Sequence, residues 1–315
     1  MLNNKNRLGG FFCLQISREK VYNIFMLKFL ETLKSKVKLG KNKKVKIGLA
    51  LGGGGARGFA HLGAIKAFEE YGLKFDFVAG TSAGSLVGAF YSHGWSYEQM
   101  YNMAKNFREK DIRRSKIPLM PSSTEGLEEI LRNNLGDIDV KESNIPLAVV
   151  AVDILSTKEC VITNGNLAKA VAGSCAVPAI FQPVEFQDRL LSDGGLQNTL
   201  PSNVPKLFGC DYVVAVDVNP SRNYGAKSTK ILDVLSATIR ILMKKNAETG
   251  YVFGDIVIQP ETKRFKSTKM EGYDEMIEEG YRATIERMPE ILALFNKKPL
   301  PRRVKQRFKH DVVII

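Results

Sequence analysis

Four consecutive glycines at residues 52–55 constrain this chain more than any other feature. They follow an apolar run over residues 45–51, which is typical of a buried strand, and precede helical apolar spacing over residues 56–71. Glycine allows sharp turns and leaves successive backbone N–H groups exposed. A glycine-rich bend between a strand and a helix start therefore predicts a loop that binds an anion, either a phosphate or the oxyanion of an acyl-transfer reaction.

The same order of strand, bend and helix recurs along the 315 residues. Further strands are predicted over residues 75–79, 147–152, 160–163, 190–192, 212–218 and 256–259, and further helices over residues 83–93, 125–135, 166–173, 231–247 and 273–295. Hydrophobic residues make up 44% of the chain, enough for a sizeable core, and no apolar run is long enough to span a membrane. This alternation predicts an α/β sheet covered by helices on both faces.

The peptide Gly-Thr-Ser-Ala-Gly at residues 80–84 lies at the second bend. A G-x-S-x-G sequence between a strand and a helix is the context of a nucleophile elbow, in which small neighbours lift the serine hydroxyl clear of the sheet. Ser82 is therefore the candidate nucleophile.

Asp193 follows a short predicted strand and precedes Gly194 and Gly195. A carboxylate at a strand end, with two glycines after it, leaves room beside it for another side chain. The same pattern is also typical of a turn in which the aspartate caps its own backbone. Both interpretations stay open at this point.

The three histidines are poorly placed for a Ser-His-Asp triad. His61 lies on the helix after the glycine loop, His93 lies about 15 Å from Ser82 by helix rise, and His310 is in the C-terminal tail. A carboxylate in a desolvated site can act as the base directly. We therefore expect a Ser82–Asp193 dyad, with His61 as a packed structural residue.

The glycine loop also fits the spacing of a dinucleotide fingerprint, through Gly53, Gly55 and Gly58. That fingerprint requires an acidic residue at the end of the second strand, to hold a ribose hydroxyl. Here Asp76 lies at the start of that strand, which argues against a dinucleotide. A P-loop is excluded because no Gly-Lys-Ser/Thr follows the glycines.

The net charge of +13 is concentrated at the two ends of the chain. Residues 1–48 carry +10 and residues 297–315 carry +6, whereas the rest is mildly acidic. Basic ends suit a polyanionic surface, such as an anionic membrane leaflet, and are equally typical of solvated tails. Nucleic acid is the weaker candidate, since the ends lack interleaved aromatic residues or a recognised module.

Three regions are predicted: a basic N-terminal extension over residues 1–44, an acyl hydrolase domain over residues 45–296, and a basic C-terminal tail over residues 297–315. Apolar residues at helical spacing over residues 26–37 indicate a basic amphipathic helix in the extension. Such a helix either lies on a membrane surface or packs on the domain. The sequence leaves these two alternatives open.

The four cysteines, Cys13, Cys160, Cys175 and Cys210, show no metal-binding or disulfide pattern. The first residues lack the apolar core and cleavage site of a signal peptide. We therefore expect reduced thiols, no metal and no cofactor, and a cytoplasmic protein that contacts the inner membrane surface at most peripherally.

Taken together, these motifs closely resemble the patatin-like phospholipase family, in particular its bacterial single-domain members. The resemblance covers roughly residues 45–260 and rests on motifs in the family's order, at residues 51–65, 80–84, 172–184, 193–195 and 209–217. It implies a three-layer α/β/α sandwich with a mostly parallel central sheet.

The resemblance also implies roles for individual residues. Ser82 would be the nucleophile and Asp193 the base, with the backbone N–H groups of Gly53, Gly54 and Gly55 as oxyanion donors. The residues expected to support these motifs are Arg57, Gly58, Gly80, Gly84, Gly194 and Gly195.

The expected function is that of a serine acyl hydrolase, a carboxylic ester hydrolase of the phospholipase A or lysophospholipase type. Its substrate would be the acyl ester of a phospholipid or related lipid, cleaved through an acyl-enzyme. The alternative is a catalytically quiet regulator that keeps the fold and binds lipid. Intact Ser82 and Asp193 argue against this alternative.

Overall fold

The computed structural model describes residues 45–106, 121–219, 228–297 and 312–315. The N-terminal extension, with its predicted amphipathic helix, and most of the basic C-terminal tail lie outside these ranges. Within them, no helix is both long enough and apolar enough to cross a membrane.

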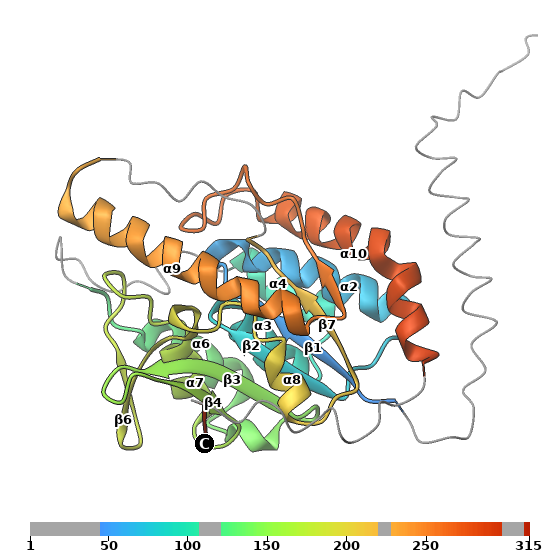
Figure 1. The fold of residues 1–315 in the computed structure, drawn as a ribbon, viewed down its shortest axis with the longest axis horizontal. Helices are drawn as coiled ribbons and strands as arrows, with labels where there is room; N and C mark the ends of the chain where they lie inside the picture. The colour runs from blue at the N-terminus through green and yellow to red at the C-terminus, as the bar shows by residue number, and fades with distance from the viewer. Residues whose placement is uncertain (1–44, 107–120, 220–227, 298–311) are drawn as a thin grey trace, which may run out of the picture. The chain divides into compact units, whose positions relative to one another are not determined.

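A mixed sheet of nine strands forms the core (Figure 1). The strands are β1 (Ile47–Leu51), β2 (Phe77–Thr81), β3 (Leu147–Asp153), β4 (Lys158–Ile162), β5 (Val184–Phe186), β6 (Arg189–Asp193), β7 (Tyr212–Val216), β8 (Ile256–Ile258) and β9 (Val312–Ile314). Their order is β5-β6-β3-β2-β1-β7-β8, with β4 paired to β3 and β9. The central run β3-β2-β1-β7-β8 is parallel throughout, as predicted.

Helices cover both faces of this sheet (Figure 1), which confirms the predicted α/β sandwich. The helices are α2 (Phe59–Glu70), α3 (Ala83–Ser92), α4 (Tyr97–Asn106), α6 (Glu125–Leu135), α7 (Leu167–Ser174), α8 (Asn203–Leu207), α9 (Ile231–Phe253) and α10 (Tyr273–Phe295). Successive strand residues point to opposite layers. Ala79 of β2 packs in one core cluster with Val204 of α8, whereas Val78 faces Gly88 of α3.

The contact between α2 and α10 depends on two glycines. A Cβ on Gly63 would lie 1.9 Å from the carbonyl oxygen of Ile277, and one on Gly280 would lie 1.9 Å from that of Ala60. The two backbones therefore touch at both points. This packing fixes α2, the helix that follows the glycine loop.

The end of the chain contributes to the sheet. Val312–Ile314 form β9, which pairs with β4 through Glu159, Cys160 and Val161. The last residues of the predicted basic tail therefore belong to the folded domain. Val312 and Val313 are apolar, unlike the charged residues before them, which accounts for their place in a strand.

Candidate active site

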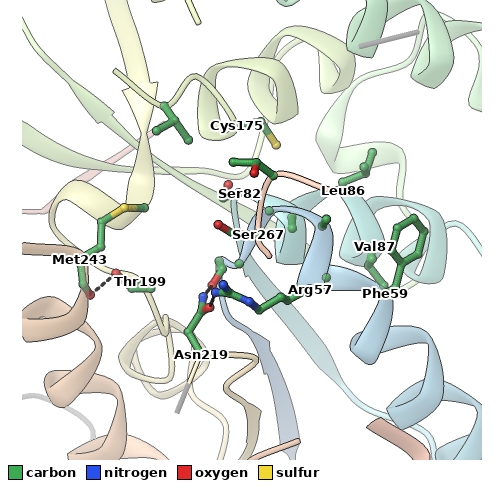
Figure 2. A pocket seen from close by; sticks show the side chains of 18 of the residues that line it. Arg57, Phe59, Ser82, Leu86, Val87, Cys175, Thr199, Asn219, Met243 and Ser267 are labelled. Atoms are coloured by element: carbon green, nitrogen blue, oxygen red, sulfur yellow. Dashed lines mark hydrogen bonds between the residues drawn. The ribbon is translucent and has the colours of Figure 1, made fainter. Parts of the chain in front are cut away.

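Ser82 occupies the bend between β2 and α3, and its side chain lies at a cavity (Figure 2). Its backbone is strained for a residue other than glycine, with φ +52° and ψ −125°. The Ser82 N–H donates to Ser174 Oγ at 2.8 Å, and this hydroxyl donates to the Val150 carbonyl at 2.5 Å. The bend is therefore anchored to β3 through α7.

The two motif glycines around Ser82 are required by close backbone contacts. A Cβ on Gly84 would lie 2.1 Å from the carbonyl oxygen of Leu51, and one on Gly80 would lie 2.5 Å from that of Gly84. Any side chain at either position would force β1, β2 and α3 apart. These contacts are the physical basis of the G-x-S-x-G spacing in this chain.

Asp193 is the last residue of β6 and is fully buried. Its N–H donates to the Ala176 carbonyl at 3.0 Å, and its Oδ1 accepts from the Gly195 N–H at 2.8 Å. The other carboxylate oxygen, Oδ2, is buried and has no hydrogen-bond partner among the described residues. One oxygen thus fixes the carboxylate, and the other is left to accept a proton.

Strand pairing brings Ser82 and Asp193 together. Parallel β2 runs along β3 until Thr81 pairs with Val150, and antiparallel β6 ends at the next position of β3, where Asp193 pairs with Ala151. Both lie on the same edge of β3, because β4 occupies the opposite edge over this stretch. Strands β2 and β6 therefore meet end to end, at the two residues predicted to form the dyad.

Gly194 lies in the narrow space where these strand ends meet. A Cβ at this position would lie 2.2 Å from the Val150 carbonyl oxygen and 3.1 Å from Thr81 Cγ2. At Gly195 a Cβ would meet Met243 Cε, the mobile end of a side chain, at 2.3 Å. The close approach of β6 to β2 thus depends mainly on Gly194.

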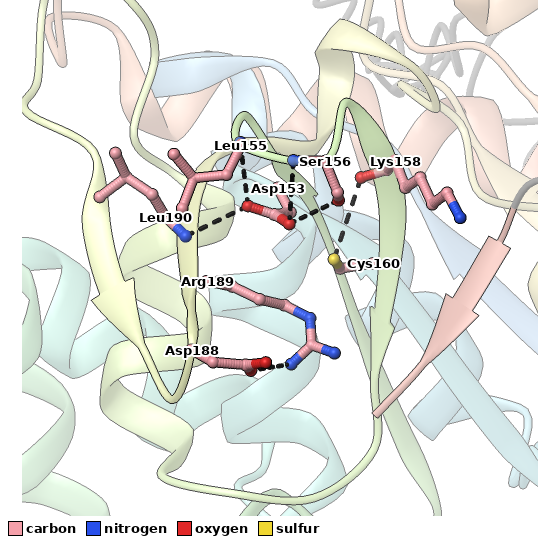
Figure 3. Close-up of polar contacts among 8 residues, drawn as sticks. All are labelled: Asp153, Leu155, Ser156, Lys158, Cys160, Asp188, Arg189 and Leu190. Atoms are coloured by element: carbon pink, nitrogen blue, oxygen red, sulfur yellow. Dashed lines mark hydrogen bonds and ion pairs between the residues drawn. The ribbon is translucent and has the colours of Figure 1, made fainter.

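A second carboxylate holds β6 in place from its other end (Figure 3). Buried Asp153, at the end of β3, accepts hydrogen bonds from Leu155 N, Ser156 N, Ser156 Oγ and Leu190 N. Burial alone would raise the pKa of Asp153, but the hydrogen bonds outweigh burial and hold it below its usual range. Asp153 therefore stays ionised and ties β6 to the turn after β3.

The environment of Asp193 prepares it to act as a base. Burial raises its pKa to about 6, and the Gly195 N–H and the nearby Ser82 hydroxyl partly offset this rise. A carboxyl group that titrates near neutrality is better matched to proton transfer than one at its usual value near 4.

The glycine loop presents two unused N–H groups to the cavity. Gly54 and Gly55 line the cavity, and neither N–H finds a partner in the described part of the chain. Gly53 differs from the prediction, because its N–H donates to the Thr199 carbonyl at 2.9 Å. It holds the loop against the segment after Asp193, so in this arrangement the candidate oxyanion donors are Gly54 and Gly55.

Arg57 and Gly58 stabilise the position of the glycine loop. Buried Arg57 donates through Nε to the Phe265 carbonyl at 3.1 Å and through Nη1 to Asn219 Oδ1. Asn219 in turn donates to the Gly53 carbonyl at 2.6 Å. A Cβ on Gly58 would lie 2.7 Å from Ala83 Cβ, so this glycine lets the loop approach the start of α3.

His61 is a structural residue, as predicted. It is fully buried, and its Nε2 lies 2.8 Å from the Gly52 carbonyl. Burial lowers the pKa of His61 to about 4, with the Gly52 hydrogen bond opposing the shift. The neutral ring thus donates to the glycine loop through Nε2.

Cys175 lies near the dyad but is not activated. Burial raises the pKa of its thiol, and the Asp193 carboxylate raises it further. Cys160 and Cys210 are also free and buried. Among the described residues, no group of three or more histidine, cysteine, aspartate or glutamate side chains could hold a metal ion.

The cavity beside Ser82 has a volume of about 700 Å³. One wall is apolar, and Figure 2 shows Phe59, Leu86 and Val87 on one side of Ser82. Met100, Leu127 and Phe181 also line the cavity. The polar residues Arg57, Asn219, Thr199 and Tyr251 line the same cavity.

Three residues that support the site were not predicted from the sequence. Ser174, Thr199 and Asn219 hold the bend and the loop through single hydrogen bonds. Each is distant in sequence from the group that it holds, by 92 residues for Ser174 and Ser82 and by 166 residues for Asn219 and Gly53. Ser174 lies within the segment 172–184 that carries the family resemblance, which is the only signal that could have found it.

Comparison with known proteins relates this chain to a family. Residues 49–204 match the family model described as patatin-like phospholipase. An uncharacterized NTE family protein of Mycobacterium tuberculosis is 33% identical over 180 residues, covering 56% of this chain and 50% of that protein. The neuropathy target esterase of Drosophila melanogaster is 26% identical over 313 residues, covering 85% of this chain and 22% of that protein.

Two further likenesses agree with this assignment. A lysophospholipase of Eremothecium gossypii is 35% identical over 179 residues, covering 55% of this chain and 12% of that protein. The chain thus spans half or less of the length of these relatives. The structure of human GIVD cytosolic phospholipase A2 superposes with a TM-score of 0.51 at 10% identity, covering 89% of this chain and 64% of that one, which shows a shared fold.

Proposed function

Because this chain belongs to the patatin-like phospholipase family, we propose that it is a serine acyl hydrolase that cleaves the acyl ester of a phospholipid or lysophospholipid. The observation that carries this proposal is the meeting of β2 and β6 on one edge of β3. This meeting supports the proposal because Ser82 directly follows β2, and Asp193 ends β6 as a buried carboxylate whose Oδ2 has no partner among the described residues. Gly54 and Gly55 line the cavity at Ser82.

In the proposed reaction, Asp193 Oδ2 accepts the hydroxyl proton as Ser82 Oγ attacks the ester carbonyl. The N–H groups of Gly54 and Gly55 donate to the carbonyl oxygen as it becomes negative. The proton on Asp193 then passes to the leaving alcohol, and an acyl-Ser82 ester remains. Asp193 next takes a proton from water as the water oxygen attacks the acyl carbonyl. It returns that proton to Ser82 Oγ when the acyl–Oγ bond breaks and the fatty acid leaves.

The shape of the cavity supports a lipid substrate. Its apolar wall, formed in part by Phe59, Leu86 and Val87, suits an acyl chain. Its polar residues, Arg57, Asn219 and Tyr251, line the same cavity. A substrate with one apolar chain and one polar group fits this mixed lining better than a fully polar ester.

The pH profile follows from the raised pKa of Asp193. The base must be ionised, so kcat/KM is expected to fall about tenfold per pH unit below about pH 6. His61 is neutral down to about pH 4, so its protonation does not cause this fall in kcat/KM. Hydrolysis of a short soluble ester from pH 4.5 to 8 measures it, and a flat profile between pH 5 and pH 7 would contradict the assignment of the base.

The substrate class is tested by following fatty acid release from defined lipids. The purified chain is expected to release fatty acid from phosphatidylcholine or lysophosphatidylcholine in a reaction that requires Ser82. Mass spectrometry of the products then gives the position and the chain that are cleaved. Binding of these lipids without release of any acid would support the catalytically quiet alternative.

A further inference from the structure

Helix α9 exposes an unusual amount of apolar surface. Seven of the ten large hydrophobic side chains exposed by the described residues lie on this helix. They are Ile231, Val234, Leu235, Ile241, Leu242, Tyr251 and Val252. The N-terminal turns of α9, orange in Figure 1, extend beyond the helices that surround them. A concentration of this kind on one element marks an interaction surface.

Five of these exposed side chains form one stripe. Positions 231, 234, 235, 241 and 242 follow the spacing of a single helical face. Ile239, Met243 and Ala247 occupy the opposite face and line the cavity beside Ser82. The helix thus has two apolar faces. One of them completes the cavity wall, and the described structure places nothing over the other.

The charges around the stripe are mainly positive. Helix α9 and the residue before it contain Lys230, Arg240, Lys244 and Lys245 against Asp233 and Glu248. The loop after β8 adds Lys263, Arg264, Lys266 and Lys269 against Glu261 and Glu271. The four basic side chains of this loop are all exposed. An apolar stripe flanked by lysine and arginine is complementary to an anionic lipid surface.

The mouth of the cavity lies beside the same helix. Lys244 and Glu248 of α9, together with Gln259 and Thr268 of the loop, line the cavity and are also exposed. Residues with both properties mark the opening. A surface that binds α9 would therefore lie next to the entrance that leads to Ser82.

We propose that α9 docks this protein on an anionic membrane, with Ile231, Val234, Leu235, Ile241 and Leu242 inserted among the lipids. Docking in this way would bring the cavity mouth to the bilayer, so that a lipid can enter with little exposure to water. The docking surface stands on its own observations, whereas the delivery of substrate to Ser82 rests on the proposed function.

The test compares two double variants, each of which changes an exposed Ile-Leu pair. In the full chain, the double variant Ile241→Glu/Leu242→Glu is expected to weaken sedimentation with phosphatidylcholine–phosphatidylserine vesicles by about tenfold or more, since two inserted side chains are lost. Neither residue lines the cavity, so turnover of a short soluble ester should not change. The control variant, Ile154→Glu/Leu155→Glu, alters an equally exposed pair on the turn after β3 and should bind vesicles as the wild type does.

Several outcomes would overturn the proposal. They are wild-type binding by the α9 variant, no preference of the wild type for anionic vesicles, or a wild-type dimer that the variant converts to a monomer. The last result would assign the stripe to a second copy of the chain. Circular dichroism checks that both variants are folded. Repeating the sedimentation in a Ser82→Ala chain separates docking from catalysis, because binding should persist there even if the proposed hydrolysis is wrong.

Discussion

Asp193→Asn is expected to lower kcat/KM for ester hydrolysis by about 10³–10⁴-fold, because the amide cannot accept the Ser82 proton and no histidine replaces it. Ser82→Ala should cost at least as much. The two losses should not add in the double variant, since both side chains serve one proton transfer. Release of p-nitrophenol from a short acyl ester measures all three variants. Either single variant with wild-type turnover would contradict the dyad.

The same variant should be more stable than the wild type above pH 6. The pKa of Asp193 is higher in the folded protein, about 6, than in an unfolded chain, about 4, so folding favours the protonated form. The penalty for ionisation grows between pH 4 and pH 6 and persists at higher pH. Removing it should stabilise the fold at pH 8 by up to about 3 kcal/mol and change little at pH 4. Thermal melts at the two pH values measure this difference.

A gain in stability together with a loss of activity is specific to a functional carboxylate. If Asp193 were only the capping residue of its turn, its replacement would lower the melting temperature at both pH values. The hydrogen bond from the Gly195 N–H to Oδ1 can be kept by the asparagine carbonyl, so the turn itself should survive. Melting and turnover measured on one preparation therefore distinguish the two roles.

Gly55→Ala is expected to lower kcat by about 10²–10³-fold, the usual cost of losing an oxyanion donor. Gly55 has φ +57°, and a Cβ there would lie 2.3 Å from the Ser267 carbonyl oxygen. The loop must shift to accommodate the methyl group, which moves the Gly54 and Gly55 N–H groups away from the developing charge. The loss should fall on kcat more than on KM, because these donors act mainly in the transition state.

Gly72→Ala is the matched control for this variant. Gly72 also has positive φ, +64°, but a Cβ there meets nothing within 4 Å. This variant should lose about 1 kcal/mol of stability through backbone strain and keep wild-type turnover. Equal activity losses in the two variants would mean that strain, and not the position of the loop, explains the effect of Gly55→Ala.

The order of strands, bends and helices is readable from the sequence because each signal is local. Apolar runs ending in glycine, as at residues 45–55, are sufficient to place β1 and the loop. The short elements β5 and α8 were missed, since three to five residues carry no clear period. Helix α9 continues to Phe253, beyond its predicted end at residue 247. Gly250 lies inside it, where the helix packs on Leu200, so it does not end the helix.

The candidate site residues could be proposed from the sequence, but their contacts could not. Nothing in the sequence shows that β6 runs antiparallel to β3 and meets β2 at Thr81, although this pairing is what joins Ser82 to Asp193. The engagement of the Gly53 N–H by Thr199 likewise depends on a segment 146 residues further along the chain. Long-range pairing of this kind is set by packing, which periodicity and motif spacing do not report.

The central claim is that Asp193 activates Ser82, and the rate of fluorophosphonate labelling of Ser82 tests it most directly. Peptide mass spectrometry locates the modified residue and gives its rate of modification at each pH. The wild type should be labelled at Ser82, with a rate that rises through a midpoint near pH 6, and Asp193→Asn should be labelled at least about 100-fold more slowly. Labelling of Ser82 at equal rates in the two proteins, or of Cys175 in place of Ser82, would contradict the account.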